Sequence, residues 1–111
     1  MTGKYLLAYG ARVDDGEDAV FRALADPTRR ALLDALVERD GQTLFELCAR
    51  MASAHGLTSS RQAISQHLDV LEAAGLVRVR REGRYRLHDV DTTPLRPIRE
   101  RWLQPDERTH P

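Results

Sequence analysis

The sequence predicts a mainly α-helical domain with one β-hairpin, in the order α-α-α-α-β-β-α. Four stretches before Gly75 repeat apolar residues every three or four positions, which is typical of amphipathic helices. After Gly75, valines alternate with arginines, which indicates strands, and a last helical stretch follows Pro94. The chain has 111 residues, which is the length of a single domain.

Capping residues set the expected boundaries of the first three helices. Asp26 is expected as an N-cap with Pro27 at the first helical position, so one helix ends there and the next begins. Thr43 and Glu46 have the spacing of a capping box. We expect these helices over about residues 17–25, 27–39 and 44–55. Their expected apolar faces are Val20, Phe21, Ala23 and Leu24; Leu32, Leu33, Leu36 and Val37; and Leu44, Leu47, Cys48 and Met51.

A fourth helix and the hairpin follow each other directly. Ser60 caps a helix over residues 61–74, and Gly75 takes the left-handed position after it. Glu82-Gly83 is the expected tip of the hairpin. The predicted apolar faces are Ile64, Leu68 and Leu71 in the fourth helix; Val77, Val79, Tyr85 and Leu87 in the hairpin; and Leu95, Ile98, Trp102 and Leu103 in a last helix that begins at Thr93-Pro94.

This order of elements is the layout of a winged helix-turn-helix. A short third helix, a tight turn and a fourth helix are followed at once by an arginine-rich hairpin. We expect the domain over residues 15–104, preceded by a loose arm over residues 1–14 and followed by a flexible tail over residues 105–111.

The outward face of the fourth helix carries side chains that suit base reading in duplex DNA. Arginine, glutamine and serine hydrogen-bond to base edges in the major groove or to phosphates. The candidates are Ser60, Arg61, Gln62, Ser65, Gln66 and His67. For His67, we expect a part in orienting or packing this helix rather than in binding metal. The alternative is an ordinary solvated helix face, although such faces are usually richer in glutamate and lysine.

Basic charge is concentrated in the hairpin, although the net charge of the chain is zero. Residues 76–88 hold five arginines and a single acid, Glu82. Arginines beside a hairpin tip can hold phosphates or enter the minor groove, and Arg80, Arg81 and Arg84 are the candidates for this contact. The alternative is a solvated strand surface without a partner.

Two motifs resemble the ArsR/SmtB family of winged-helix repressors. One is Phe21 to Arg30, with the sequence FRALADPTRR; the other is Ser60 to Leu68, SRQAISQHL, continued by Leu71 to Val77, LEAAGLV. The resemblance spans about residues 17–103. It implies a homodimer built by the first and last helices, which binds a palindromic operator and represses its own operon. The expected dimer contacts are Val20, Leu24, Leu95, Ile98 and Trp102.

The residues that bind metal in some members of this family are missing here. The third-helix site of those members is a Cys-x-Cys pair, whereas this chain has Cys48 and, two residues later, Arg50. The other site uses Asp and His on the last helix, and neither occurs between Leu95 and Leu103. We therefore expect no metal and no cofactor, and the sequence does not identify an inducer.

The remaining features suggest a cytoplasmic regulator that is not an enzyme. Cys48 is the only cysteine, so it fits a reducing compartment; a small buried side chain is the favoured interpretation and a redox switch the alternative. The apolar run Tyr5 to Ala8 is too short for a membrane span, so we expect no membrane contact. The sequence contains no recognisable nucleophile–base pair or phosphate loop. A winged helix used for protein–protein contact is the alternative function.

Overall fold

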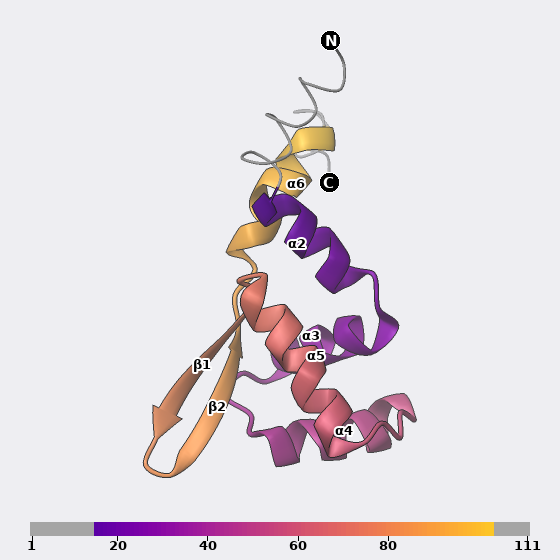
Figure 1. Cartoon of the computed structure of the whole chain (residues 1–111), viewed down its shortest axis with the longest axis vertical. Coiled ribbons are helices and arrows are strands. Elements are labelled where there is room, and N and C mark those ends of the chain that lie inside the picture. Colours follow the sequence, from indigo (N-terminus) through magenta and orange to yellow (C-terminus); the bar gives the residue numbers. More distant parts are fainter. Residues whose placement is uncertain (1–14, 104–111) are drawn as a thin grey trace.

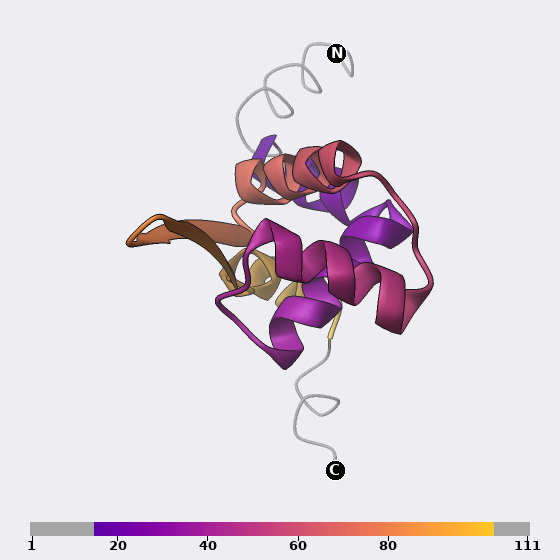
Figure 2. The same ribbon diagram turned by 90° about the horizontal axis from the view of Figure 1, so that it is seen from below.

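The computed structural model describes residues 15–103, which form a group of packed helices with a projecting hairpin (Figure 1). Figure 2 shows the hairpin extending to one side of the helices. The arm and tail predicted over residues 1–14 and 105–111 lie outside the described residues. In chain order the elements are α2 (Asp15–Leu24), α3 (Pro27–Glu38), α4 (Leu44–His55), α5 (Arg61–Ala73), β1 (Val77–Glu82), β2 (Tyr85–Val90), η1 (Thr93–Leu95) and α6 (Arg96–Trp102). The predicted fold is confirmed.

The three predicted N-caps are present. The Asp26 carboxylate and the Ser60 hydroxyl each accept a hydrogen bond from the backbone N–H three residues later, and Pro27 occupies the first turn of α3. Thr43 and Glu46 form the reciprocal bonds of a capping box. The N–H of Thr43 is the main cause that lowers the pKa of the Glu46 carboxyl. The starts of α3, α4 and α5 are therefore determined by local side-chain chemistry.

The core lies where α3, α4 and α5 meet, and α2 and the start of β1 close it. Its members are Val20, Ala23, Ala31, Leu32, Ala35, Leu36, Leu47, Met51, Ile64, Leu68, Leu71, Leu76 and Val77. The predicted stripe of α3 is wrong at Val37, which is 66% exposed. The small side chains of Ala31 and Ala35 turn inward instead and allow close packing, so the buried face is rotated away from Val37.

The hairpin tip is one residue later than predicted. Glu82 pairs with Tyr85, so the two loop residues are Gly83 and Arg84. Gly83 has φ of 62°, and none of the described residues other than glycine has a positive φ. A glycine with positive φ at the first loop position is what a type II′ hairpin requires.

The faces of β2 are also opposite to those predicted. Because Val79 pairs with His88 and Val77 pairs with Val90, these four side chains share the face turned towards the core. Tyr85, which was expected to join them, is 61% exposed. A one-residue shift of register moves every side chain of a strand to the other face. The error in the tip position does not cause this, because moving a two-residue loop by one position changes the pairing by two residues and keeps the faces. Tyr85 and Leu87 were placed with the valines because they are apolar.

A buried polar pair attaches the hairpin to the helices. Gln42 and His88 are 3% and 6% exposed. His88 donates its backbone N–H and its ring Nδ1–H to the Gln42 carbonyl, both at 2.8 Å, because a carbonyl can only accept. The Gln42 amide donates to the carbonyls of Ala35 at 3.1 Å and of Arg39 at 2.7 Å, at the end of α3. Gln42 thus connects α3 with β2.

The last helix begins differently from the prediction. Thr93 and Pro94 lie in the 3-10 turn η1, and α6 follows from Arg96 with Pro97 in its first turn. The Asp91 carboxylate accepts the N–H of Thr93 at 2.9 Å, which is the main cause that lowers the pKa of Asp91. The start of α6 is therefore determined by a turn rather than by a Thr93 cap.

We expect Gln42→Leu to destabilise the protein by about 1–3 kcal/mol, because it leaves buried carbonyls without their donor. Urea denaturation would measure this loss. The matched control is Gln62→Leu on the exposed face of α5, which should change stability by less than about 0.5 kcal/mol. Equal midpoints for the two variants would contradict a structural role for Gln42.

Candidate nucleic-acid interface

The first two turns of α5 present most of the predicted base-reading residues to solvent. Arg61, Gln62 and Gln66 are exposed, and Ser65 is half-buried. Ser60 is exposed, but its hydroxyl already accepts the N–H of the third residue after it. This face is turned outward because the opposite side of α5 is buried in the core.

His67 lies apart from these residues. Its ring is half-buried against the start of α3, where Nδ1 lies 3.1 Å from a terminal nitrogen of Arg29. Its Nε2 lies 3.9 Å from a carboxylate oxygen of Asp26. This position favours the expectation that His67 packs and orients α5 over a direct contact with DNA, which stays a prediction.

The three predicted arginines of the hairpin differ in their surroundings. Arg80 donates to Asp89 at 2.6 Å and to Glu82 at 2.9 Å, and the bond to Asp89 is the main cause that raises its pKa. Arg81 and Arg84 are exposed and have no acidic partner among residues 15–103. Two of the three predicted arginines are thus available to an anion, and Arg80 is already neutralised.

Arg81 also faces a second arginine that the sequence reasoning did not select. Arg81 and Arg86 are directly opposite each other in the register, and both are exposed. Within the described part of the chain, no acid forms an ion pair with either of them. Like charges directly opposite in a hairpin repel each other, and an anion between them would remove this repulsion.

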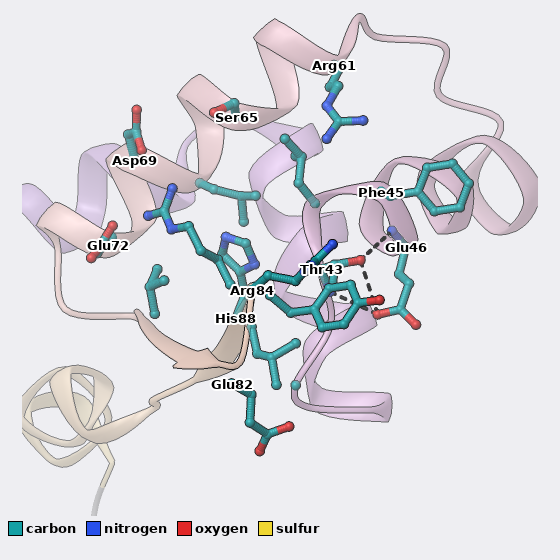
Figure 3. A pocket seen from close by; sticks show the side chains of 17 residues that line it. Thr43, Phe45, Glu46, Arg61, Ser65, Asp69, Glu72, Glu82, Arg84 and His88 are labelled. Carbon is teal, nitrogen blue, oxygen red and sulfur yellow. Dashed lines mark hydrogen bonds between the residues drawn. The ribbon is translucent and has the colours of Figure 1, made fainter.

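An open cleft of about 890 Å³ separates α5 from the hairpin, and the start of α4 closes one end (Figure 3). Arg61 and Ser65 line it from α5, and Arg84 lies across from them on the hairpin (Figure 3). Further along α5, Asp69 and Glu72 line the same cleft. Glu46 and Glu82 also line the cleft, but they are paired with Arg39 and Arg80. Among the described residues, the charge without an ion-pair partner is therefore positive next to the N-terminal half of α5 and negative next to its C-terminal half.

Two aromatic side chains in this cleft were missed by the sequence reasoning. Phe45 on α4 is 69% exposed, and Tyr85 on β2 is 61% exposed. The signal for Tyr85 was its place beside the hairpin tip, but its apolar character led us to expect it on the buried face. Phe45 is the second residue after Thr43, the N-cap of α4, and its neighbour Leu44 was the one counted in the buried stripe.

A second surface lies where α6 packs beside α2. The ring centroids of Phe21 and Trp102 are 6.4 Å apart, and these residues are 41% and 60% exposed. Three of the predicted dimer residues on α2, η1 and α6, Leu24, Leu95 and Ile98, are partly buried and pack against the core. Val20 is 2% exposed and belongs to the core, which corrects its assignment to a dimer contact.

The surroundings of Cys48 do not fit a thiolate metal site. Cys48 is half-buried against the core, and the side chain of Arg50 is bound to Glu38. Residues 15–103 bring together no group of three or more His, Cys, Asp or Glu side chains that is placed to hold a metal ion.

Among the helices of the same residues, none has the length and apolar character that a membrane span needs.

Comparison with known proteins identifies the class of this domain. A family model described as a helix-turn-helix domain matches residues 24–80. The chain is similar to an uncharacterized HTH-type transcriptional regulator of Bacillus subtilis, YuzN, with 44% identity over 92 residues, which is 83% of this chain and 100% of YuzN. The sequence and fold are therefore those of a regulator of transcription, not of an enzyme.

Two solved structures give the family. An ArsR-like transcriptional regulator from Rhodococcus sp. RHA1 has 33% identity and a TM-score of 0.69, covering 79% of this chain and 74% of that protein. The homodimeric winged helix-turn-helix domain of Mb0332 from Mycobacterium bovis, described as a possible ArsR-family regulator, has 28% identity and a TM-score of 0.60. The match covers 74% of this chain and 69% of the Mb0332 domain. The chain therefore belongs to the ArsR family of winged helix-turn-helix transcriptional regulators.

Proposed function

We propose that this protein is a homodimeric repressor that binds a palindromic operator in duplex DNA, including one that controls its own operon. One observation carries the proposal. Arginines without an acidic partner in the described structure line the cleft from both sides, with Arg61 on α5 and Arg84 and Arg86 on the hairpin. Such a cleft attracts a phosphate strand, and it lies beside the exposed polar face of α5.

The N-terminal half of α5 is the part that enters the major groove. Arg61, Gln62, Ser65 and Gln66 then reach base edges, with arginine selecting guanine and glutamine selecting adenine. Asp69 and Glu72 repel phosphates, so they keep the DNA away from the C-terminal half of the helix.

The hairpin holds the backbone of the DNA. Phosphate oxygens between Arg81 and Arg86 relieve the repulsion of this pair, and Arg84 at the tip reaches the neighbouring groove. These contacts add affinity without selecting a sequence, and they weaken as salt rises. Arg80 contributes less, because Asp89 and Glu82 already neutralise it.

A dimer places two copies of α5 on the DNA. The exposed Phe21 and Trp102, with the partly buried Leu24, Leu95 and Ile98, are the apolar surface that a second copy covers. Mb0332, a solved relative in this family, is described as homodimeric. Two-fold symmetry of the protein requires a palindromic operator, and a dimer bound across a promoter excludes the polymerase.

Fluorescence anisotropy on the DNA upstream of the protein's own gene tests this proposal, with a scrambled duplex as the control. We expect tighter binding to the upstream DNA and a steep loss of affinity for both duplexes as salt rises. Added zinc or chelator should change neither result. Failure to bind either duplex would overturn the proposal and favour the alternative that the winged helix contacts other proteins.

Variants of α5 and of the hairpin should differ in how they weaken binding. Arg61→Ala and Gln62→Ala should each cost about 1–3 kcal/mol on the upstream DNA and little on scrambled DNA, because base contacts are lost. Arg84→Ala should weaken both duplexes alike and reduce the salt dependence. Arg80→Ala is the matched control and should have a smaller effect than Arg84→Ala. If all four variants lost the same affinity on both duplexes, this division of roles would be wrong.

Sedimentation velocity tests the dimer surface. Trp102→Asp should give a monomer, because a charge would be buried in an apolar contact. Phe45→Asp introduces the same charge at another exposed aromatic residue, on the DNA-binding side, and should remain a dimer. A dimer in both variants would place the contact elsewhere.

A further inference from the structure

Arg29 connects the end of α2 to the middle of α5. Its Nε donates to the carbonyl of Ala23 at 2.8 Å, and one terminal nitrogen donates to the carbonyl of Arg22 at 2.9 Å. The other terminal nitrogen lies 3.1 Å from Nδ1 of His67 on α5. One half-buried guanidinium thus satisfies two carbonyls in the last turn of α2 and binds the candidate DNA-reading helix.

This contact determines which nitrogen of His67 carries the proton. A guanidinium has only donors and stays charged in proteins, so Nδ1 of His67 has to accept. The ring is therefore neutral, with its hydrogen on Nε2, and this atom faces the Asp26 carboxylate at 3.9 Å. If the ring were protonated, Nδ1–H would point at the guanidinium, and Arg29 would lose its acceptor.

We infer that Arg29 and His67 are positioning residues for α5. Neutral His67 accepts a hydrogen bond from Arg29, and this bond holds the base-reading face of α5 at a fixed angle to α2. Protonation of His67 breaks the bond to Arg29, and the angle is then no longer fixed. This inference deepens the proposed DNA-binding function and rests on it. The connection matters because α2 carries part of the proposed dimer surface. The distance between the two copies of α5 on DNA then depends on how Arg29 and His67 connect α2 to α5.

The charges around His67 set the direction of the effect. Asp26 and Arg29 face the ring from the start of α3, whereas α2 contributes the carbonyls of Ala23 and Arg22 to the cluster. Desolvation acts to raise the pKa of Asp26, but the hydrogen bond from the Arg29 N–H, the charge that His67 carries when protonated and the charge of Arg29 outweigh it and lower the pKa. A protonated ring is repelled by Arg29 and attracted by this carboxylate, so protonation breaks the contact with Arg29 and strengthens the one with Asp26.

Nitrogen-15 NMR of the full chain tests the geometry without DNA. The ring of His67, assigned by comparison with His67→Asn, should be the Nε2–H form at about pH 8, where histidine is neutral. Substitution Arg29→Met should remove this preference, because the donor to Nδ1 is lost. An Nδ1–H form of His67 in the unsubstituted protein would overturn the inference.

The functional test compares selectivity at about pH 8 and about pH 5.5, at constant salt. The probe is a duplex that the unsubstituted protein selects from a random-sequence library, measured against a scrambled duplex. Selectivity, the ratio of the two dissociation constants, should fall on acidification by up to about tenfold, because the free energy of one hydrogen bond to a charged group limits how much its loss can change the placement of α5. In His67→Asn, the side-chain oxygen of Asn replaces Nδ1 as an acceptor that does not titrate. Whatever the selectivity of His67→Asn at about pH 8, we expect this ratio to change by less than about twofold between about pH 8 and about pH 5.5.

The control is His55→Asn at the exposed end of α4, which should keep the pH profile of the unsubstituted protein. Identical profiles for the unsubstituted protein and His67→Asn would overturn the inference. Arg29→Lys should retain more selectivity than Arg29→Met, because it keeps one charged donor. If the protein selected no duplex from the library, the proposed DNA-binding function would fail, while the NMR experiment would still decide the geometry of Arg29 and His67.

Discussion

The burial of one side of α5 is the constraint on which the rest of the structure depends. Ile64, Leu68 and Leu71 are spaced by four and three residues, so they commit one face of α5 to the core and turn the opposite face to solvent. Leu76 and Val77 enter the same core immediately after the helix. The chain therefore has to leave the core beside α5, and the hairpin and its cleft lie next to the polar face of the helix.

Local charge pairing explains how a chain with zero net charge can present a basic surface. Arg78 and Arg80, near the base of the hairpin, are bound to Asp91 and Asp89. Towards the tip, the cross-strand neighbour of Arg81 is another arginine. The same residue type is thus neutralised where an aspartate lies beside it and left with positive charge towards the hairpin tip. A sum over the sequence does not separate these two uses.

Features with local causes could be predicted, and features that depend on long-range pairing could not. The caps at Asp26, Thr43 and Ser60 lie within a few residues of the groups they bind, so their spacing in the sequence was sufficient. The faces of β2 depend on the register of the hairpin, and the apolar character of Tyr85 and Leu87 wrongly placed them on the face of Val77 and Val79. The burial of Gln42 and His88 depends on a contact between residues far apart in the chain. The core position of Val20 likewise depends on how α2 packs.

The hairpin is firmly attached at its base and unconstrained in length at its tip. The Asp40 carboxylate accepts the N–H of Val90, and Gln42 forms an isolated β-bridge with His88, so the loop between α3 and α4 is bonded to the base of the hairpin. A Cβ at Gly83 would meet nothing within 4 Å. Insertions and deletions should therefore be tolerated at the tip and rejected between residues 39 and 43. Adding one residue to each strand would extend the hairpin by about 3.3 Å. A change in hairpin length alone would therefore change how far the arginines at its tip reach along the DNA.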